Sequence, residues 1–374
     1  MKRTIFILID WFSPAYKAGG PITSITNLVN SFSDNIIYRI ICSNTDLDKK
    51  VLKNIVSDSW IDYNQSTKIW YCSNNIYSFR VLKRELKSSD SAILFINGIY
   101  SFYFNVLPII FFNKYKKIIS PRGMLNAGAL SQKSLKKIIY LKFLKLLRID
   151  KKCVFHASSI EEKEYIKSVF GRESKICIAE NFPRKFNQQI LPFKKVNVLQ
   201  LVSLSLISPM KNHLNTLEAL KNCQGQIIYN IYGPIKDSEY WDKCLKCIDQ
   251  LPSHVTVTYH SDIQPSEVNI ALMQNQVFIQ PSKSENFGHS IFEALTIGLP
   301  VITSHNTPWN NLKDRYAGLN VDGENILEIS AAINFFSSMA QDQLSSWHDG
   351  AATYAENAIN FYEIKEKYTQ LFDL

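Results

Sequence analysis

Short apolar runs of three to six residues alternate along the chain with longer segments whose apolar residues recur at helical spacing. The first such pair is Thr4–Ile9 followed by Ile22–Phe32. Further runs that fit buried strands are Tyr38–Cys42, Lys68–Tyr71, Ala92–Asn97, Lys117–Ser120, Val154–Ala157, Lys175–Ala179, Val198–Ser203, Ile227–Tyr232, Val255–Tyr259, Val277–Gln280 and Val301–Thr303. Segments that fit helices are Tyr100–Phe112, Ser131–Lys152, Ser159–Phe170, Asn215–Ala219, Pro265–Leu272, His289–Ile297, Ile326–Ala340 and Trp347–Phe372. This alternation predicts an α/β protein with parallel sheets.

A polar segment with two prolines, Pro183–Val196, divides this pattern into two halves. We therefore predict one domain over residues 1–183, a second over 196–350, and a final helical segment over 351–374. A hydrophobic content of 46% with 20% charged residues is typical of a globular protein. No apolar run reaches the ~18 residues of a membrane span. Because the first apolar run already ends at Asp10, too early for a signal peptide, we expect a cytoplasmic protein.

The stretch Val277–Ser304 is predicted to form strand, loop, helix and strand, and it carries the most specific chemistry. The first amides of its helix belong to Gly288, His289 and Ser290. Such amides at a helix N-terminus favour an anion. Glu285 precedes this anion site and Glu293 lies one turn into the helix, where the two carboxylates could accept hydrogen bonds from sugar hydroxyls. The pattern therefore favours a sugar nucleotide, and the alternative is an ordinary turn with two solvated glutamates.

The string S-E-N-F-G-H-S-I-F-E-A-L-T-I-G-L-P-V-I, Ser284–Ile302, resembles the donor-site signature of retaining glycosyltransferases of family 4, also called glycosyl transferases group 1. The resemblance implies the GT-B fold, in which two Rossmann-like domains face each other across a cleft, and activity without a metal or other cofactor. It implies that Glu285 faces the transferred sugar, that Glu293 binds the ribose, and that Phe287 belongs to the donor site. It also implies that residues 351–374 pack back on the first domain.

Other residues match the family only in part. In the family, a glycine pair after the first strand closes over the donor diphosphate, and Gly19 and Gly20 match that pair. Lys211 matches the lysine of a diphosphate clamp, but Leu206 stands in place of the clamp's arginine and cannot bind phosphate. Arg122 stands where many members have a histidine that touches the sugar. An arginine there could hold phosphate with two hydrogen bonds, or it could be a loop arginine paired with an acid.

Two short patterns suggest metal or thiol chemistry. Asp46 and Asp48 form a DxD triplet, which binds metal in the other main glycosyltransferase fold. Asn44 and two lysines flank the triplet, so we expect a solvated loop here. Cys244 and Cys247 form a CxxC pattern without a second Cys or His pair nearby, so we expect two thiols on a helix and no zinc site.

The charge is divided unevenly along the chain. Residues 1–190 hold 30 Lys and Arg against 14 Asp and Glu, whereas the remainder holds 12 against 19. The densest basic segment is Ser131–Lys152, with eight Lys and Arg and an apolar stripe that includes Ile138, Leu141 and Leu144. A helix of this kind docks on an anionic membrane surface, or it is a solvated basic face over a core stripe. Aromatic residues are not interleaved with the basic ones as single-stranded nucleic acid requires, so we expect no nucleic-acid partner.

The resemblance, taken with these observations, implies a retaining hexosyltransferase. It would use a nucleotide sugar and a glycan acceptor, expected to be lipid-linked, in bacterial O-antigen or capsule assembly at the cytoplasmic face of the inner membrane. The catalytic candidates are Glu285, Lys211 and Arg122. Two other classes stay open. A nucleotide-sugar epimerase of GT-B fold needs an acid and a base, for which His156, His289 and Asp10 are candidates, and Leu206 keeps a non-catalytic nucleotide-sugar binder open.

Overall fold

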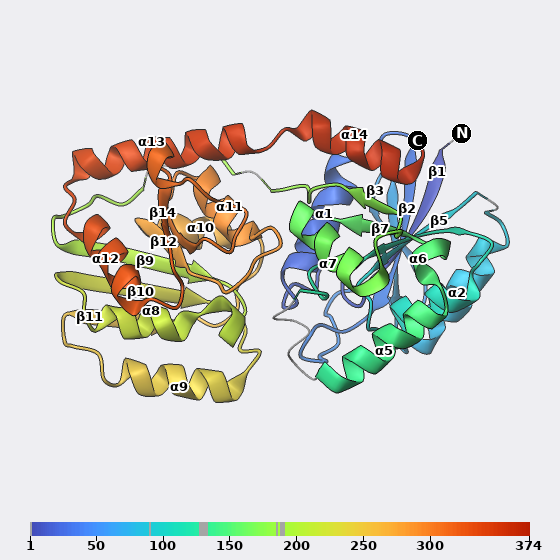
Figure 1. The fold of residues 1–374 in the computed structure, drawn as a ribbon, viewed down its shortest axis with the longest axis horizontal. Coiled ribbons are helices and arrows are strands. Elements are labelled where there is room, and N and C mark those ends of the chain that lie inside the picture. The colour runs from blue at the N-terminus through green and yellow to red at the C-terminus, as the bar shows by residue number, and fades with distance from the viewer. Residues whose placement is uncertain (1, 90, 127–133, 185, 188–190) are drawn as a thin grey trace. The chain divides into compact units, whose positions relative to one another are not determined.

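The computed structural model describes residues 2–89, 91–126, 134–184, 186–187 and 191–374. Residue contacts divide the chain into two compact units. Unit 1 comprises residues 1–182 and 361–374, and unit 2 comprises residues 183–360 (Figure 1). The first three residues of the basic segment Ser131–Lys152 lie outside the described residues.

Unit 1 is built on an eight-stranded sheet in the order β3-β4-β2-β1-β5-β6-β7-β8. The strands are β1 (Arg3–Leu8), β2 (Ile36–Ser43), β3 (Trp60–Asn64), β4 (Thr67–Cys72), β5 (Ile93–Asn97), β6 (Lys116–Ser120), β7 (Val154–Ala157) and β8 (Ile176–Ile178). Neighbouring strands pair in parallel, except that β3 runs antiparallel to β4 at the edge. The chain builds outwards in both directions from the neighbours β1 and β5, so the loops after these strands flank the place where open α/β sheets bind ligands.

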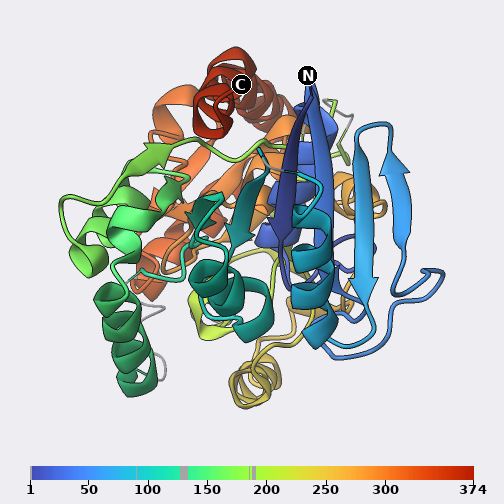
Figure 2. The same cartoon turned by 90° about the vertical axis from the view of Figure 1, so that its right-hand side faces the viewer.

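The described helices of unit 1 are α1 (Gly20–Ser31), α2 (Ile76–Leu86), η1 (Phe102–Val106), α3 (Leu107–Phe111), α5 (Ser134–Leu146), α6 (Ile149–Lys152), α7 (Ile160–Phe170) and α14 (Phe361–Phe372). Helix α2 packs on β2 and β4, and η1 packs on β5 (Figure 2). The single helix predicted over Tyr100–Phe112 is instead a π-helical turn followed by a short α-helix. Pro108 accounts for the change, because it has no N–H to continue the hydrogen-bond ladder. None of the described helices is long and apolar enough to cross a membrane.

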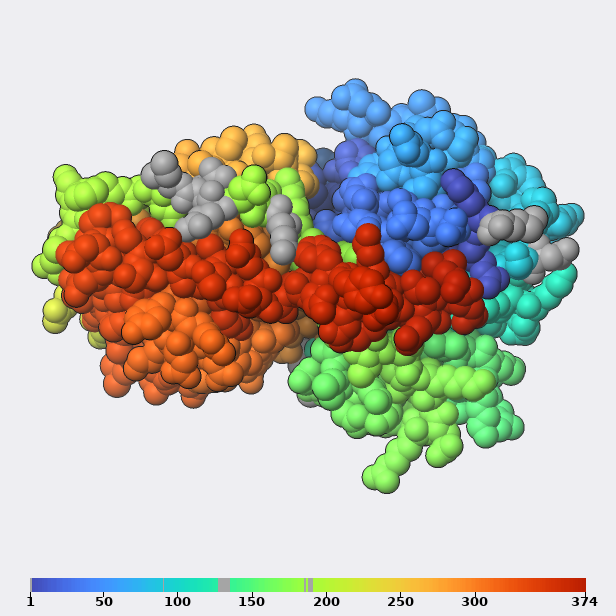
Figure 3. Space-filling view, turned by 90° about the horizontal axis from the view of Figure 1, so that it is seen from above, coloured from blue at the N-terminus to red at the C-terminus, as the bar shows by residue number. Residues whose placement is uncertain are grey.

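The last helix, α14, lies on unit 1 between the N-terminal part, in blue, and the green region of β7, α7 and β8 (Figure 3). Its Tyr368 ring is buried 5.1 Å from that of Phe182. The prediction of one helix over Trp347–Phe372 is wrong. The structure has α13 (Gln341–Ala358) in unit 2 and α14 in unit 1, because the backbone becomes extended at Ile359.

Unit 2 has a six-stranded parallel sheet in the order β11-β10-β9-β12-β13-β14. Its strands are β9 (Val198–Leu204), β10 (Gln226–Tyr232), β11 (Val255–Tyr259), β12 (Val277–Gln280), β13 (Val301–Ser304) and β14 (Gly318–Val321). Its other elements are η2 (Pro209–Lys211), α8 (His213–Leu220), α9 (Ser238–Ile248), α10 (Val268–Met273), α11 (His289–Thr296), η3 (Lys313–Arg315), α12 (Ile326–Ser337) and α13. This strand order is that of the Rossmann fold.

Both faces of the unit 2 sheet are covered. Val277 and Ile279 of β12 belong to the apolar cluster on one face, and Phe278 between them belongs to the cluster on the other. This alternation explains why β12 is a continuous apolar run. Helix α9 carries Cys244 and Cys247 as buried free thiols, which confirms the prediction that both thiols lie on a helix.

Candidate functional site

The carboxyl ends of β9 and β12 meet in unit 2, because these two strands are the neighbours from which the sheet builds outwards. The loop after β9 ends in the turn η2, which carries Lys211, and the loop after β12 carries Glu285. The backbone N–H of Lys283 donates to the carbonyl of Met210 at 2.9 Å and joins the two loops. Both predicted residues therefore lie at the edge where open α/β sheets bind ligands.

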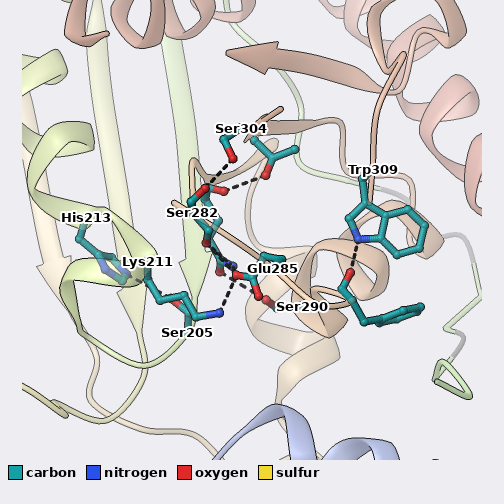
Figure 4. Close-up of polar contacts among 11 residues, drawn as sticks. Ser205, Lys211, His213, Ser282, Glu285, Ser290, Ser304 and Trp309 are labelled. Atoms are coloured by element: carbon teal, nitrogen blue, oxygen red, sulfur yellow. Dashed lines mark hydrogen bonds and ion pairs between the residues drawn. The ribbon is translucent and has the colours of Figure 1, made fainter. Parts of the chain in front are cut away.

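Lys211 and Glu285 form an ion pair, with 2.5 Å between Nζ and Oε1 (Figure 4). The same oxygen accepts hydrogen bonds from Ser282 Oγ at 2.7 Å and Gln280 Nε2 at 2.9 Å. The side chains are only 20% and 9% exposed for Lys211 and Glu285, so water screens their charges incompletely. All three donors bind Oε1. They hold the carboxylate in one orientation and leave Oε2 outside these three bonds.

Gln280, the last residue of β12, connects Glu285 to helix α11. Its Nε2 donates to Glu285, and its Oε1 accepts a hydrogen bond from Ser290 Oγ at 3.3 Å. Ser282 is held in turn, because its carbonyl accepts a bond from Ser304 Oγ (Figure 4). Sequence reasoning missed Gln280 and Ser282. The available signal was a polar residue at the end of a buried strand, since buried polar groups are hydrogen-bonded.

The turn before α11 is fixed by a tryptophan. Gly288 has φ 76° and ψ 61°, the left-handed conformation that glycine adopts most readily. A Cβ atom at Gly288 would lie 3.2 Å from Trp309 Nε1, which itself donates to the carbonyl of Phe287 at 2.6 Å (Figure 4). Phe287 is buried against Trp309, with 5.2 Å between the rings, so its side chain supports the turn. The beginning of α11, where His289 and Ser290 lie, thereby keeps a geometry that favours an anion.

Glu293 is buried one turn into α11. Burial raises the pKa of its carboxyl to about 7, although the positive charge of Arg184 acts in the opposite direction. Arg184 is held by a 2.9 Å hydrogen bond from Nη1 to the carbonyl of Pro265, a contact that the sequence does not signal. Glu285 and Glu293 are both shielded from water, so the alternative of two solvated glutamates is wrong. A buried carboxyl with such a pKa is typical of a functional site.

Lys211 is the cation that the loop after β9 contributes. Its neighbour His213 is buried, with Nε2 3.3 Å from Ser205 Oγ. Burial, together with the charge of Lys211, lowers the pKa of His213 to about 3, so this imidazole is neutral at physiological pH. Leu206 lies in the same loop, where the resembling family has an arginine, and its aliphatic side chain adds no charge.

The two predicted glycines belong to unit 1. Gly19 and Gly20 lie between β1 and α1, in one of the two loops where a doubly wound sheet receives ligands. Gly19 has φ 70° and ψ −129°, a backbone conformation that strongly favours glycine, and its carbonyl accepts the amide of Ile22 at 3.0 Å. The pair therefore forms the transition from loop to helix.

Arg122 is used within unit 1. Its Nε and Nη2 donate to Asn97 Oδ1 at 3.1 and 3.0 Å, and Nη1 donates to Asn181 Oδ1. Burial lowers the pKa of its guanidinium, and a hydrogen bond with Tyr368 of α14 opposes that shift. These contacts join the end of β5 to the segment after β8. They favour a structural role, and the negative charge of Glu162 also acts on the guanidinium.

His156 is also committed to the fold of unit 1. Its Nδ1 lies 2.8 Å from Ser120 Oγ, and its Nε2 lies 2.8 Å from the carbonyl of Ala179. Burial, followed by the charge of Arg122, lowers its pKa to about 3. This histidine is therefore poorly suited to be the acid or base that an epimerase needs.

Comparison with known proteins gives a family match for unit 2 and structural matches for the fold. Residues 184–351 match the family model "Glycosyl transferases group 1". No curated protein matches the chain. Among solved structures, sucrose-phosphate synthase from Thermosynechococcus elongatus is similar with a TM-score of 0.75 and 14% identity, covering 100% of this chain and 98% of the other. HepE of Anabaena in complex with UDP and glucose is similar with a TM-score of 0.69 and 13% identity, and the match covers 99% of each chain.

WaaG, described as a glycosyltransferase involved in lipopolysaccharide biosynthesis, gives a TM-score of 0.66 and 13% identity, covering 99% of each chain. These likenesses extend over both units, and the family match covers the unit that holds Lys211, Glu285 and Glu293. The chain therefore has the GT-B fold, and the family model matches its second unit.

Proposed function

We propose that this chain is a retaining glycosyltransferase that moves a hexose from a nucleotide sugar to a sugar acceptor. The observation that carries this proposal is the Lys211–Glu285 ion pair, which lies in the loops after the central strands β9 and β12 of unit 2. The glycine turn at Gly288 and the buried Glu293 come next along the chain. A cation and helix amides suit a diphosphate, and the two carboxylates suit hydroxyls on the sugars that flank it. The complex of HepE with UDP and glucose supports a nucleotide sugar as the donor.

Each group has a distinct role in the proposed reaction. Lys211 and the first amides of α11 stabilise the negative charge on the departing diphosphate, which is the largest expected catalytic term. Glu285 orients the sugar through its hydroxyls, and Glu293 binds the ribose.

The proposed transfer needs no separate base to accept the proton of the acceptor hydroxyl. The acceptor oxygen bonds to the anomeric carbon on the face from which the phosphate leaves. The bond from that carbon to the phosphate oxygen breaks, its electron pair goes to the phosphate, and the acceptor's proton goes to the same phosphate. Because entry and departure share one face, the anomeric configuration is retained.

The acceptor is proposed to be a lipid-linked glycan of O-antigen or capsule assembly. The similarity to WaaG, described as involved in lipopolysaccharide biosynthesis, supports this class. Mass spectrometry of lipid-linked glycans from cells with and without the protein tests it. We expect cells without it to accumulate a glycan that lacks one hexose. Identical lipid-linked glycans in both cells would contradict the assignment.

Helix α5 supports a peripheral site on the cytoplasmic face of the inner membrane. Leu141 and Leu144 of the predicted stripe are buried in the core of unit 1, whereas Ile138 is 45% exposed, so the prediction is wrong for Ile138. On the opposite side of the helix, Leu135, Ile139 and Leu146 are 72%, 61% and 79% exposed, at the spacing of a single face. Grouped exposed apolar residues mark interaction sites, and the lysines among them favour an anionic bilayer.

We expect unmodified protein to sediment with vesicles that contain anionic lipid and to release from them as salt is added, because the attraction is screened over about 8 Å at physiological ionic strength. The lysines to be changed together to glutamine are Lys136, Lys142 and Lys145. At about 1 kcal/mol for each lysine, their loss is expected to weaken partitioning roughly a hundredfold.

The matched control changes the exposed Lys243 and Lys246 of α9 to glutamine, which should leave partitioning unchanged. A second variant carries serine at the exposed apolar positions Leu135, Ile139 and Leu146, and is expected to bind more weakly even at low salt. Binding to nucleic acid at physiological salt, without binding to anionic vesicles, would show that the membrane assignment is wrong.

Transfer is also proposed to need no metal ion, because Lys211 and the helix amides supply positive charge at the diphosphate. We expect the initial rate in excess EDTA to stay within about twofold of the untreated rate, whereas metal-dependent transferases lose activity. The check is a rate measurement before and after chelation. A loss of activity that Mg²⁺ or Mn²⁺ restores would contradict this proposal.

A further inference from the structure

The loops after β1 and β5 of unit 1 meet through a contact between two polar side chains. Asp10 follows the end of β1 at Leu8, and Ser101 follows the end of β5 at Asn97. Ser101 Oγ donates a hydrogen bond to Asp10 Oδ1 at 2.6 Å. Because β1 and β5 are the neighbours from which the sheet builds outwards, this contact lies where an open α/β sheet receives its ligand.

Ser101 is held in place by the turn that follows β5. Its amide donates to Asn105 Oδ1 at 2.9 Å, and Asn105 Nδ2 donates to the carbonyl of Asn97 at 2.9 Å. The carbonyl of Ser101 accepts the amide of Val106 at 2.9 Å, a bond that belongs to the π-helical turn η1. Asn105 is only 1% exposed, so this turn is fixed from inside the protein. Single π-helical turns are found frequently at functional sites.

Asp10 is held by the backbone of the neighbouring strand β2. Its carbonyl accepts the amide of Ser43 at 3.0 Å. Further along the loop that Asp10 begins, Asp46 Oδ2 accepts the amide of Tyr16 at 3.0 Å. Asp46 is only 5% exposed, so the prediction of a solvated loop is wrong for this residue. These contacts keep the loop, and with it the Asp10 carboxylate, in one conformation.

The chemistry of this pair suits an uncharged ligand that carries hydroxyl groups. An ionised carboxylate has about four acceptor sites, so the hydrogen bond from Ser101 leaves capacity for a ligand hydroxyl. Burial raises the pKa of the Asp10 carboxyl, and the hydrogen bond from Ser101 opposes that shift. A carboxylate that is partly shielded from water repels anions, so a phosphate is disfavoured here. The loops of unit 2 differ, because Lys211 supplies positive charge there.

We propose that unit 1 has its own binding site for a sugar, in which Asp10 and Ser101 form hydrogen bonds with sugar hydroxyls. The site is defined within unit 1 and requires no contact with unit 2. The identification of this sugar as part of the acceptor rests on the proposed function, whereas the binding itself does not.

The experiment measures how the methyl glycosides of glucose, galactose, mannose and N-acetylglucosamine bind to unmodified protein without nucleotide, by saturation-transfer NMR. At least one of them is expected to bind. The variant Asp10→Asn keeps the shape of the side chain and removes its charge. Its affinity for the same glycoside is expected to be at least about tenfold weaker, because a charged acceptor makes the stronger kind of hydrogen bond.

Hydrogen exchange locates the bound glycoside. Peptides that contain Asp10 or Ser101 are expected to exchange more slowly when the glycoside is added to unmodified protein, and to show no such change in Asp10→Asn. Inorganic phosphate at the same concentration tests the preference for an uncharged ligand, and it should leave both peptides unchanged. Slower exchange with phosphate, and with none of the glycosides, would show that the ligand class is wrong.

The matched control is Asp62→Asn, which removes the same charge from an exposed side chain of β3 that pairs with Lys68. It should bind the glycoside as tightly as unmodified protein does. If Asp10→Asn does not fold, Ser101→Ala takes its place. That variant removes the hydroxyl that donates to Asp10, and an about threefold loss of affinity is expected.

The site would be overturned if none of the four glycosides binds, or if unmodified protein and Asp10→Asn bind them equally. Sugar binding that depends on Asp10, in a protein that consumes no nucleotide sugar, would support the site and contradict the proposed function. Transfer from a nucleotide sugar, with glycoside affinity unchanged in Asp10→Asn, would support the proposed function and contradict the site. The two failures are therefore distinguishable.

Discussion

Replacing Lys211 with methionine is expected to lower kcat for glycosyl transfer about 10²–10³-fold, the usual loss when one charge-stabilising donor is removed from a transition state. Methionine keeps the apolar stem and removes the ammonium group. Leu206 cannot compensate, and His213 is held neutral beside Lys211. Steady-state kinetics with the donor at saturation provides the measurement.

Lys283→Met is the matched control, because Lys283 lies in the neighbouring loop and forms an exposed pair with Glu324 at 2.7 Å. An exposed pair of this kind contributes about 0–1 kcal/mol, so this variant should keep nearly full activity. Equal turnover by Lys211→Met and unmodified protein would exclude Lys211 from the stabilisation of the diphosphate.

Glu293→Ala is expected to weaken nucleotide binding by about 1.5–3 kcal/mol, the range for a hydrogen bond to a charged group. The effect depends on pH, because the pKa of the buried Glu293 carboxyl is about 7 before the donor binds. The ribose hydroxyls donate to the ionised form. Affinity in unmodified protein should therefore rise between pH 6 and pH 8 and become constant above that range. Calorimetry with UDP and GDP over this interval measures both effects.

The Glu293→Gln variant tests the direction in which ionisation of Glu293 changes folding stability. The pKa of Glu293 is raised from 4.5 to about 7, so folding favours its neutral form. The stabilisation by the neutral carboxyl is therefore complete below pH 4.5 and is lost as the pH rises through 7. The free energy of unfolding falls by roughly 3 kcal/mol in total, at 1.36 kcal/mol per pKa unit. The glutamine variant should thus unfold at higher temperature than unmodified protein at pH 8. A pH-independent affinity in unmodified protein would remove Glu293 from the ribose site.

The sequence was sufficient for the central strands of both sheets and for the alternation with helices. Central strands are buried on both faces, so they appear as apolar runs that polar loops delimit. The edge strand β3 was missed, because its residues are only partly buried and no apolar run marks it. Strand β14 was missed because it is short and begins with Gly318.

For the candidate site, motif spacing identified the residues on which the chemistry depends, such as Lys211 and Glu285, but not the residues that hold them. Gln280 orients Glu285 only because β12 ends beside the turn before α11, and Arg184 acts on Glu293 from a linker that is remote in sequence. Contacts of this kind depend on strand order, which residue spacing does not encode. Asp46 shows the reverse error, because an acidic triplet among lysines resembles a solvated loop until β1 and β2 bring it beside Tyr16.

The most direct test of glycosyl transfer is NMR spectroscopy of the product that unmodified protein forms from a nucleotide hexose and lipid-linked acceptors. We expect a free nucleoside diphosphate and a new glycosidic bond whose anomeric configuration is that of the donor. A glycoside of inverted configuration would contradict the proposed attack on the face from which the phosphate leaves. A free nucleotide sugar with altered ring stereochemistry would contradict transfer altogether.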